Sequence, residues 1–128
     1  MRRLAAAALV LGLLAAGGAA AAPPAAEGPG AESSLKRMLS ALRTGSYEEF
    51  LSDAEEPFRA ALNQTTFDAV TARMAPRLKG GYTLTYLGTL NQVGYAVNLW
   101  KISFKDGKDD VLAKISTKGG KVGGFYLQ

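Results

Sequence analysis

Residues 80–128 constrain the fold more than any other stretch, because tyrosines, branched aliphatic residues and Trp100 alternate there with polar residues between glycine-marked turns. Alternation with a period of two is typical of β-strands that bury one face. An Asp-Gly pair, Asp106-Gly107, lies between two such runs and is a strong signal for a tight hairpin. Lys118-Gly119-Gly120-Lys121 marks a second hairpin. The stretch therefore predicts a curved antiparallel meander of four strands.

The predicted strands cover residues 82–87, about 94–105, 110–117 and 122–127. In the second strand the apolar pattern changes phase: Val97 and Leu99 share one face, and the other face carries Trp100, Ile102 and Phe104. A β-bulge near Leu99-Trp100 would bring both groups to the core side and curl the strand. The alternative is a strand that is buried on both faces, which needs a covering layer on each side. Gly88 marks a further bulge or bend, in the first strand.

Two glycines, Gly123 and Gly124, lie inside the last predicted strand. A glycine inside a strand often marks a place where a neighbouring side chain or a ligand approaches the backbone closely. We therefore expect close approach at this position.

Helical periodicity precedes the sheet. A first helix is expected from Ser33 to Thr44, because apolar residues recur there at helical spacing, namely Leu35, Met38, Leu39 and Leu42. Gly45 suits its C-terminal end, and Ser46 with Glu49 forms a capping box for the next helix. A short helix follows from Pro57. The last helix opens near residue 65, with Phe67, Val70, Met74 and Leu78 inward, and Pro76 is expected to break or kink its final turn.

Helices followed by strands predict the α+β class: N-terminal helices packed on a curved, four-stranded antiparallel meander. This single domain would span residues 33–128. Residues 22–32 are rich in proline, glycine and alanine and have no pattern that could bury a face, so we expect a disordered tether.

Residues 1–21 have the three parts of a secretory signal peptide: a positive start at Arg2 and Arg3, an apolar stretch from Leu4 to Leu14, and small residues up to the cleavage region. The apolar stretch is shorter than the roughly 20 residues of a membrane-spanning helix. We therefore expect an exported protein, periplasmic or extracellular, with no stable membrane span after the signal is cleaved.

The composition argues against several classes of function. The chain has no cysteine and no histidine, which removes thiol nucleophiles, disulfides, and the commonest general base and transition-metal ligand. Loss of Arg2 and Arg3 with the leader lowers the formal charge from +4 to +2. The remaining basic residues are scattered, whereas a nucleic-acid binder concentrates them in a patch. The sequence therefore predicts no catalytic residue, no metal site, no cofactor and no nucleic-acid partner.

Aromatic residues supply the candidate binding site. A set of six could line an apolar pocket with phenolic donors, as in many small-molecule sites: Tyr82, Tyr86, Tyr95, Trp100, Phe104 and Tyr126. The alternative is that they form the core of a small sheet, because aromatic side chains bury large areas and tyrosine can keep its hydroxyl group at an edge.

Three local motifs add a family resemblance: residues 44–50 between the first two helices, residues 78–82 at the entry to the sheet, and residues 121–125 near its end. Together with the element order, they resemble small exported bacterial members of the nuclear transport factor 2-like superfamily, within the wider cystatin-like α+β grouping. The resemblance implies a cone-like domain, in which a curved sheet wraps around helices and the interior either holds a ligand or is filled by side chains. It also implies that dimers and non-catalytic modules are common among such proteins.

The leading hypothesis is an exported, non-enzymatic domain that binds a small apolar ligand or a protein partner, with a homodimer through the open sheet face as one form of partnership. One alternative is a cone-pocket lyase or isomerase that relies on tyrosine and carboxylate. Another is a secreted inhibitor or an envelope structural protein.

Overall fold

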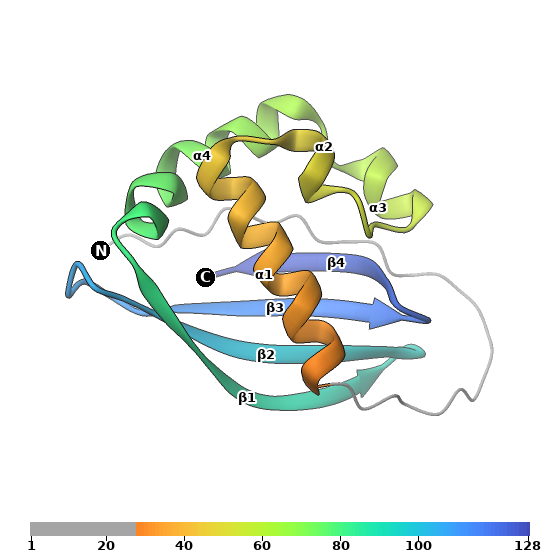
Figure 1. The fold of residues 1–128 in the computed structure, drawn as a ribbon. Coiled ribbons are helices and arrows are strands. Elements are labelled where there is room, and N and C mark those ends of the chain that lie inside the picture. Colours follow the sequence, from red (N-terminus) through yellow and green to blue (C-terminus); the bar gives the residue numbers. More distant parts are fainter. Residues whose placement is uncertain (1–27) are drawn as a thin grey trace.

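The computed structural model describes residues 28–128, so the predicted signal peptide and most of the predicted tether lie outside the described residues. Four helices precede a four-stranded antiparallel sheet (Figure 1). The helices are α1 (Gly28–Thr44), α2 (Tyr47–Phe50), α3 (Glu56–Ala61) and α4 (Gln64–Lys79). The strands are β1 (Tyr82–Gln92), β2 (Tyr95–Phe104), β3 (Val111–Lys118) and β4 (Lys121–Leu127). This arrangement confirms the predicted α+β class.

Helix α1 lies across one face of the sheet (Figure 1) and begins at Gly28, earlier than the predicted start at Ser33. Ala31 is buried in the same core as the predicted inward residues, so the additional helical turn also contributes to the core. The helix ends as expected, at Gly45 with a φ of 78°. The Ser46 hydroxyl group then accepts from the Glu49 N–H at 3.2 Å, which confirms the Ser46 half of the predicted capping box, while the Ser46 N–H donates to the carbonyl oxygen of Ala41.

Helix α4 differs from the prediction at its end. Pro76 lies inside the helix, which continues to Lys79, so the expected break does not occur. The N-cap is Asn63, whose side chain accepts from the N–H of Thr66 at 2.8 Å. The inward side chains Phe67, Met74 and Leu78 are buried as predicted.

The strands follow one another in the sheet in the order β1-β2-β3-β4. The register shifts in β1 between Tyr86 and Gly88, where Leu87 is the extra residue. The bulge therefore lies opposite Leu99 and Trp100, but in the neighbouring strand. Because β2 itself stays regular, Val97 and Leu99 remain on the face opposite Trp100. The prediction of a bulge within β2 is wrong for this reason.

The sheet therefore has two distinct faces. The core face packs against the helices and carries the buried side chains of Trp100, Ile102, Ala113, Ile115 and Phe125. We call the opposite side the outer face; it carries Tyr95, Val97, Leu99, Lys114, Ser116 and Tyr126. Phe50 and Phe67 join the helices to the core face, with the Phe50 ring 5.2 Å from Phe67 and 5.4 Å from Phe125.

The edge of β4 is partly covered by the segment between α2 and α3. Ala54 forms an isolated parallel bridge with Val122. The Val122 N–H donates to the carbonyl oxygen of Asp53 at 2.7 Å, and the Glu55 N–H donates to the carbonyl oxygen of Val122 at 2.9 Å. This short segment brings Glu55 to the sheet. Among residues 28–128, no helix is long and apolar enough to cross a membrane.

Candidate functional site

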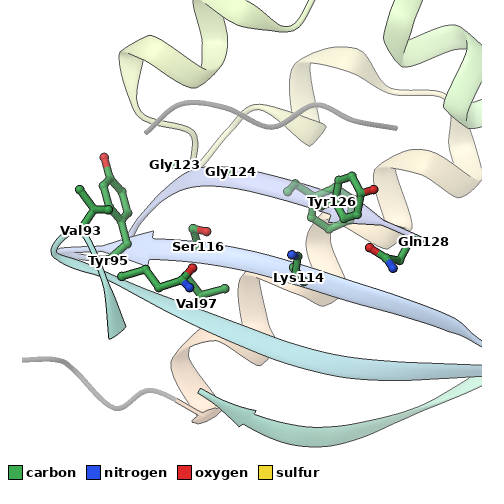
Figure 2. A pocket seen from close by; sticks show the side chains of 11 residues that line it. Val93, Tyr95, Val97, Lys114, Ser116, Gly123, Gly124, Tyr126 and Gln128 are labelled. Carbon is green, nitrogen blue, oxygen red and sulfur yellow. The ribbon is translucent and has the colours of Figure 1, made fainter. Parts of the chain in front are cut away.

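A hollow of about 410 Å³ opens on the outer face of the sheet, across β2, β3 and β4 (Figure 2). Its volume falls within the roughly 300–1,000 Å³ of small-molecule sites. The residues that line it are Gln92, Val93, Tyr95, Val97, Lys114, Ser116, Gly123, Gly124, Phe125, Tyr126 and Gln128. Apart from Phe125, whose side chain lies on the core face, they come from the outer face and the ends of neighbouring strands. The sheet register therefore decides which of them meet.

The floor of the hollow follows from that register. Ser116 on β3 pairs with Val97 on one side and with Gly124 on the other. Gly124 has no side chain, so the hollow is open beside Ser116. The next residue on this face of β3 is Lys114, which pairs with Tyr126. In Figure 2, Ser116 and Lys114 lie between Tyr95 at one end of the hollow and Tyr126 at the other.

Tyr95 stands at one end of the hollow because Glu55 holds its hydroxyl group. The Tyr95 hydroxyl group lies 2.9 Å from Oε1 and 2.7 Å from Oε2 of Glu55. Gly123 makes this contact sterically possible: a Cβ atom at this position would lie 2.5 Å from Cε2 of Tyr95. Gly123 is also the extra residue at the register shift between β3 and β4. The predicted close approach to the glycines of β4 is confirmed at this residue.

This environment keeps the Tyr95 phenol protonated. Burial, the hydrogen bond to Glu55 and the negative charge of that carboxylate raise the pKa of Tyr95 from 10.0 to about 12. The neutral hydroxyl group is the donor that Glu55 requires. The pair therefore fixes the position of the tyrosine ring, which forms one wall of the hollow.

Two lysines place positive charge near the tyrosine rings. The Lys114 ammonium lies 5.2 Å from the centroid of the Tyr126 ring, and the Lys118 ammonium lies 5.2 Å from that of Tyr95. The lining of the hollow contains no aspartate or glutamate. Among the ion pairs of residues 28–128, neither lysine has a carboxylate partner. The hollow therefore has apolar and aromatic walls and two nearby ammonium groups that form no ion pair with a described acidic side chain, while Glu55 lies behind the Tyr95 ring at one end.

The structure divides the six aromatic residues singled out by the sequence between the two faces. Tyr95 and Tyr126 line the hollow. The other four lie on the core face: Tyr82, Tyr86, Trp100 and Phe104. Sequence reasoning missed Lys114 and Ser116, although their alternation with Val111, Ala113 and Ile115 already placed them on one face of β3. It also missed Glu55, because only the tertiary fold brings this residue to Tyr95.

Between the sheet and the helices, the gap around Phe50 and Phe125 is small. A gap of about 10 Å³ there is bordered by side chains of α1, α2, α4 and β4 and of the α3–α4 connection, namely Leu42, Phe50, Leu62, Phe67, Val70, Phe125 and Leu127. That volume is about the size of one water probe. The core face thus leaves no room for an organic ligand at this gap, whereas the outer face does.

Comparisons with protein-family models, with curated proteins and with solved structures find no match for the chain. Within the part of the chain that the structure describes, no group of three or more acidic side chains lies close enough to hold a metal ion. A functional proposal for this protein therefore rests on the geometry of the hollow.

Proposed function

We propose that the protein is an exported, non-enzymatic binding module, and that its ligand is a small amphipathic anion held in the outer-face hollow. The observation that carries the proposal is the position of Lys114. Its ammonium group lies beside the Tyr126 ring, in a hollow whose lining contains no aspartate or glutamate side chain. A bound anion would supply the missing negative charge.

The remainder of the lining suits an apolar body. The walls are formed by Val97, Tyr95 and Tyr126. Tyrosine rings provide large contact areas with little loss of side-chain entropy. Ser116 provides a hydroxyl donor next to the floor. Small-molecule sites typically combine mostly apolar walls with a few polar groups that fix orientation. An alkyl or aromatic carboxylate, or a sulfonate, has this combination of features.

The enzymatic alternative would use a tyrosine and a carboxylate, and Tyr95 with Glu55 is such a pair. Three observations favour binding over catalysis. The Tyr95 phenol is neutral at ordinary pH, and its raised pKa makes loss of the proton still less favourable, so it is a poor base. Its hydroxyl group also already donates to Glu55. The gap of about 10 Å³ between the helices and the core face is also too small to hold a substrate.

Export remains a prediction from residues 1–21, and the resemblance to the nuclear transport factor 2-like superfamily is likewise supported only by the sequence motifs. An exported inhibitor or envelope structural protein would act through a protein surface. Such a protein would not need to bind a small molecule in the hollow, so a ligand-binding measurement distinguishes these hypotheses from the proposed one.

Titration with the fluorescent anion 1-anilinonaphthalene-8-sulfonate, followed by displacement with decanoate, tests the proposal. Lys114→Met keeps the length of the side chain and removes its charge, and we expect affinity to fall about tenfold or more, since hydrogen bonds to charged groups contribute about 1.5–3 kcal/mol. Gly124→Val should fill the floor and weaken both ligands. Lys101→Met is the matched control, because Lys101 is a half-buried lysine of β2 that does not line the hollow.

Several results would overturn the proposal. Binding that responds to neither Lys114→Met nor Gly124→Val, or that responds equally to Lys101→Met, would place the anion elsewhere. Absence of binding by both ligands would reject an anion site in this hollow.

A further inference from the structure

The two edges of the sheet differ in how they are covered. The edge of β4 is paired with the Asp53–Glu55 segment through two backbone hydrogen bonds to Val122. The opposite edge is β1, and within residues 28–128 this strand pairs only with β2. An exposed edge presents a row of unpaired backbone donors and acceptors that can pair with another chain.

The register identifies the backbone groups that point outward. The Lys105 N–H donates to the carbonyl oxygen of Gly81 at 2.9 Å, at the entry to the β1–β2 pair. In an antiparallel pair, hydrogen-bonded and non-hydrogen-bonded residues alternate. Thr83 and Thr85 therefore bond to β2. The N–H and C=O groups of Tyr82, Leu84 and Tyr86 point away from the sheet.

The exposed apolar side chains gather at the same edge. Among the described residues, the exposed large hydrophobic side chains are Tyr86, Leu87 and Leu90 of β1, and Val93 in the turn that follows it. Tyr86 is 44% exposed and Leu87 is 53% exposed. Residues 82–92 also contain no charged residue and no proline. Natural edge strands commonly carry charged residues or proline, which prevent pairing with another chain. Because β1 has neither, it is suited to a partner strand.

We propose that β1 pairs with β1 of a second copy of this chain, antiparallel and about a two-fold axis at Leu84. In this register, Leu84 lies opposite Leu84 of the other copy, and Tyr82 lies opposite Tyr86. The three outward-pointing residues of each copy then form about six backbone hydrogen bonds. A second copy is the occupant because two uncharged strands bring no like charges together, and a two-fold axis makes one patch complementary to itself.

The side chains of β1 are compatible with this register. Thr83 and Thr85 are both exposed on the outer face. The two-fold axis places Thr83 of each copy opposite Thr85 of the other copy. Threonine pairs across strands are favourable, as are aromatic pairs such as Tyr82 with Tyr86. The bulge at Leu87 limits the paired stretch to the residues before it. This interface is at the sheet edge, so it leaves the outer-face hollow open and does not depend on the proposed function.

Charge substitutions at the two threonines test both the dimer and its register. The full-length sequence is expressed, and the protein is purified as the host cell processes it. Its mass is measured by sedimentation from about 1 µM to about 1 mM, because dimerisation depends on concentration. The first variant carries Thr83→Glu with Thr85→Glu, and the second carries Thr83→Lys with Thr85→Lys. The control carries Thr65→Glu with Ala72→Glu, both at exposed positions of α4.

We expect the wild type and the control to double in mass as concentration rises. Each charged β1 variant alone should stay monomeric, because the two-fold axis places like charges opposite each other. An equal mixture of the two should regain the doubled mass through Glu-Lys pairs. A wild type that stays monomeric throughout would overturn the proposal and leave this edge to residues 1–27 or to an unrelated strand. Charged variants that dimerise like the wild type would also overturn it, because they would place the dimer on another surface.

Discussion

The hydroxyl group of Tyr95 shares its hydrogen bond between both carboxylate oxygens of Glu55, at 2.9 Å and 2.7 Å. This contact joins the start of β2 to the residue that precedes α3. The Tyr95 ring passes over Gly123 of β4 to make it. Three distant parts of the chain thus meet at one end of the outer-face hollow, and the absence of a side chain at residue 123 allows the meeting.

Gly123→Ala should separate Tyr95 from Glu55. The new Cβ atom would lie 2.5 Å from the Tyr95 ring and 2.7 Å from the Glu55 carboxylate, so one of them must move. We expect the free energy of unfolding, measured in urea, to fall by about 1–3 kcal/mol, as overpacking typically costs. Gly124→Ala is the control, because its nearest neighbour would be at 3.6 Å and the change should stay within about 0.5 kcal/mol. Equal losses in the two variants would contradict this account.

Alkaline pH should weaken the same contact. The pKa of Tyr95 is raised from 10.0 to about 12, so between these values the folded protein retains a proton that the unfolded chain has lost. The stabilisation is therefore complete below pH 10 and is lost as the pH rises towards 12. Phenolate absorbance should show Tyr95 ionising near pH 12. In the Tyr95→Phe variant, that part of the titration should disappear; its persistence would assign it to another tyrosine.

Much of the fold follows from local patterns in the sequence. The helical spacing of Leu35, Leu39 and Leu42 identified the buried face of α1, and all three side chains are fully buried. The Asp-Gly and Gly-Gly pairs identified the turns, where Gly107, Gly119 and Gly120 have positive φ angles. These signals are reliable because each depends on a few neighbouring residues. Pro76 shows their limit, since α4 stays helical beyond it and buries Leu78 in the core.

The candidate site was less accessible to sequence reasoning. Alternation assigns side chains to two faces of a strand, but it does not say which face of each strand meets which face of the next. The phase of the apolar pattern predicted a bulge in β2, but the extra residue is Leu87 in β1, so Val97 and Leu99 stay on the outer face. Glu55 is 40 residues from Tyr95, and no local pattern links the two. Both depend on pairing between distant segments.

Asn98 is a polar residue on the core face, and its replacement should be costly. Its side chain is 0% exposed. Its amide donates to the carbonyl oxygens of Ala96 and Ile115, both at 3.3 Å, and its Oδ1 accepts from the Thr89 hydroxyl group at 2.8 Å. We expect Asn98→Ala to lower the free energy of unfolding by about 1–3 kcal/mol, since it leaves partly buried polar groups without partners.

A double-mutant cycle with Thr89→Val separates the hydrogen bond from the loss of packing. The cost of Thr89→Val should be smaller in the Asn98→Ala protein than in the wild type, because the shared bond is already absent. Urea unfolding of the four proteins provides the measurement. Additive costs would show that the Thr89–Asn98 bond contributes nothing to stability.

Acid should release the ion pair that joins α4 to the β2–β3 hairpin. Arg77 donates to Asp106 through Nε at 2.8 Å and through Nη2 at 3.2 Å, and it lies over the Phe104 ring. The hydrogen bonds from Arg77 and from the Lys108 N–H lower the pKa of Asp106 from 3.8 to about 2. Because the pKa of Asp106 is lower in the folded protein than in the unfolded chain, its carboxylate stabilises the fold fully at pH values above the unfolded pKa of 3.8. This stabilisation is lost as the pH falls from about 4 to about 2.

Asp106→Asn should therefore be less stable than the wild type at neutral pH, with a difference that shrinks as the pH falls through this range. Urea midpoints measured at neutral pH and at steps below pH 4 provide the test. Asp110→Asn serves as the control, because this exposed acid lies in the same hairpin but outside the Arg77 contacts. A difference between Asp106→Asn and the wild type that stays constant down to pH 2 would show that the charge of Asp106 is not what stabilises the hairpin.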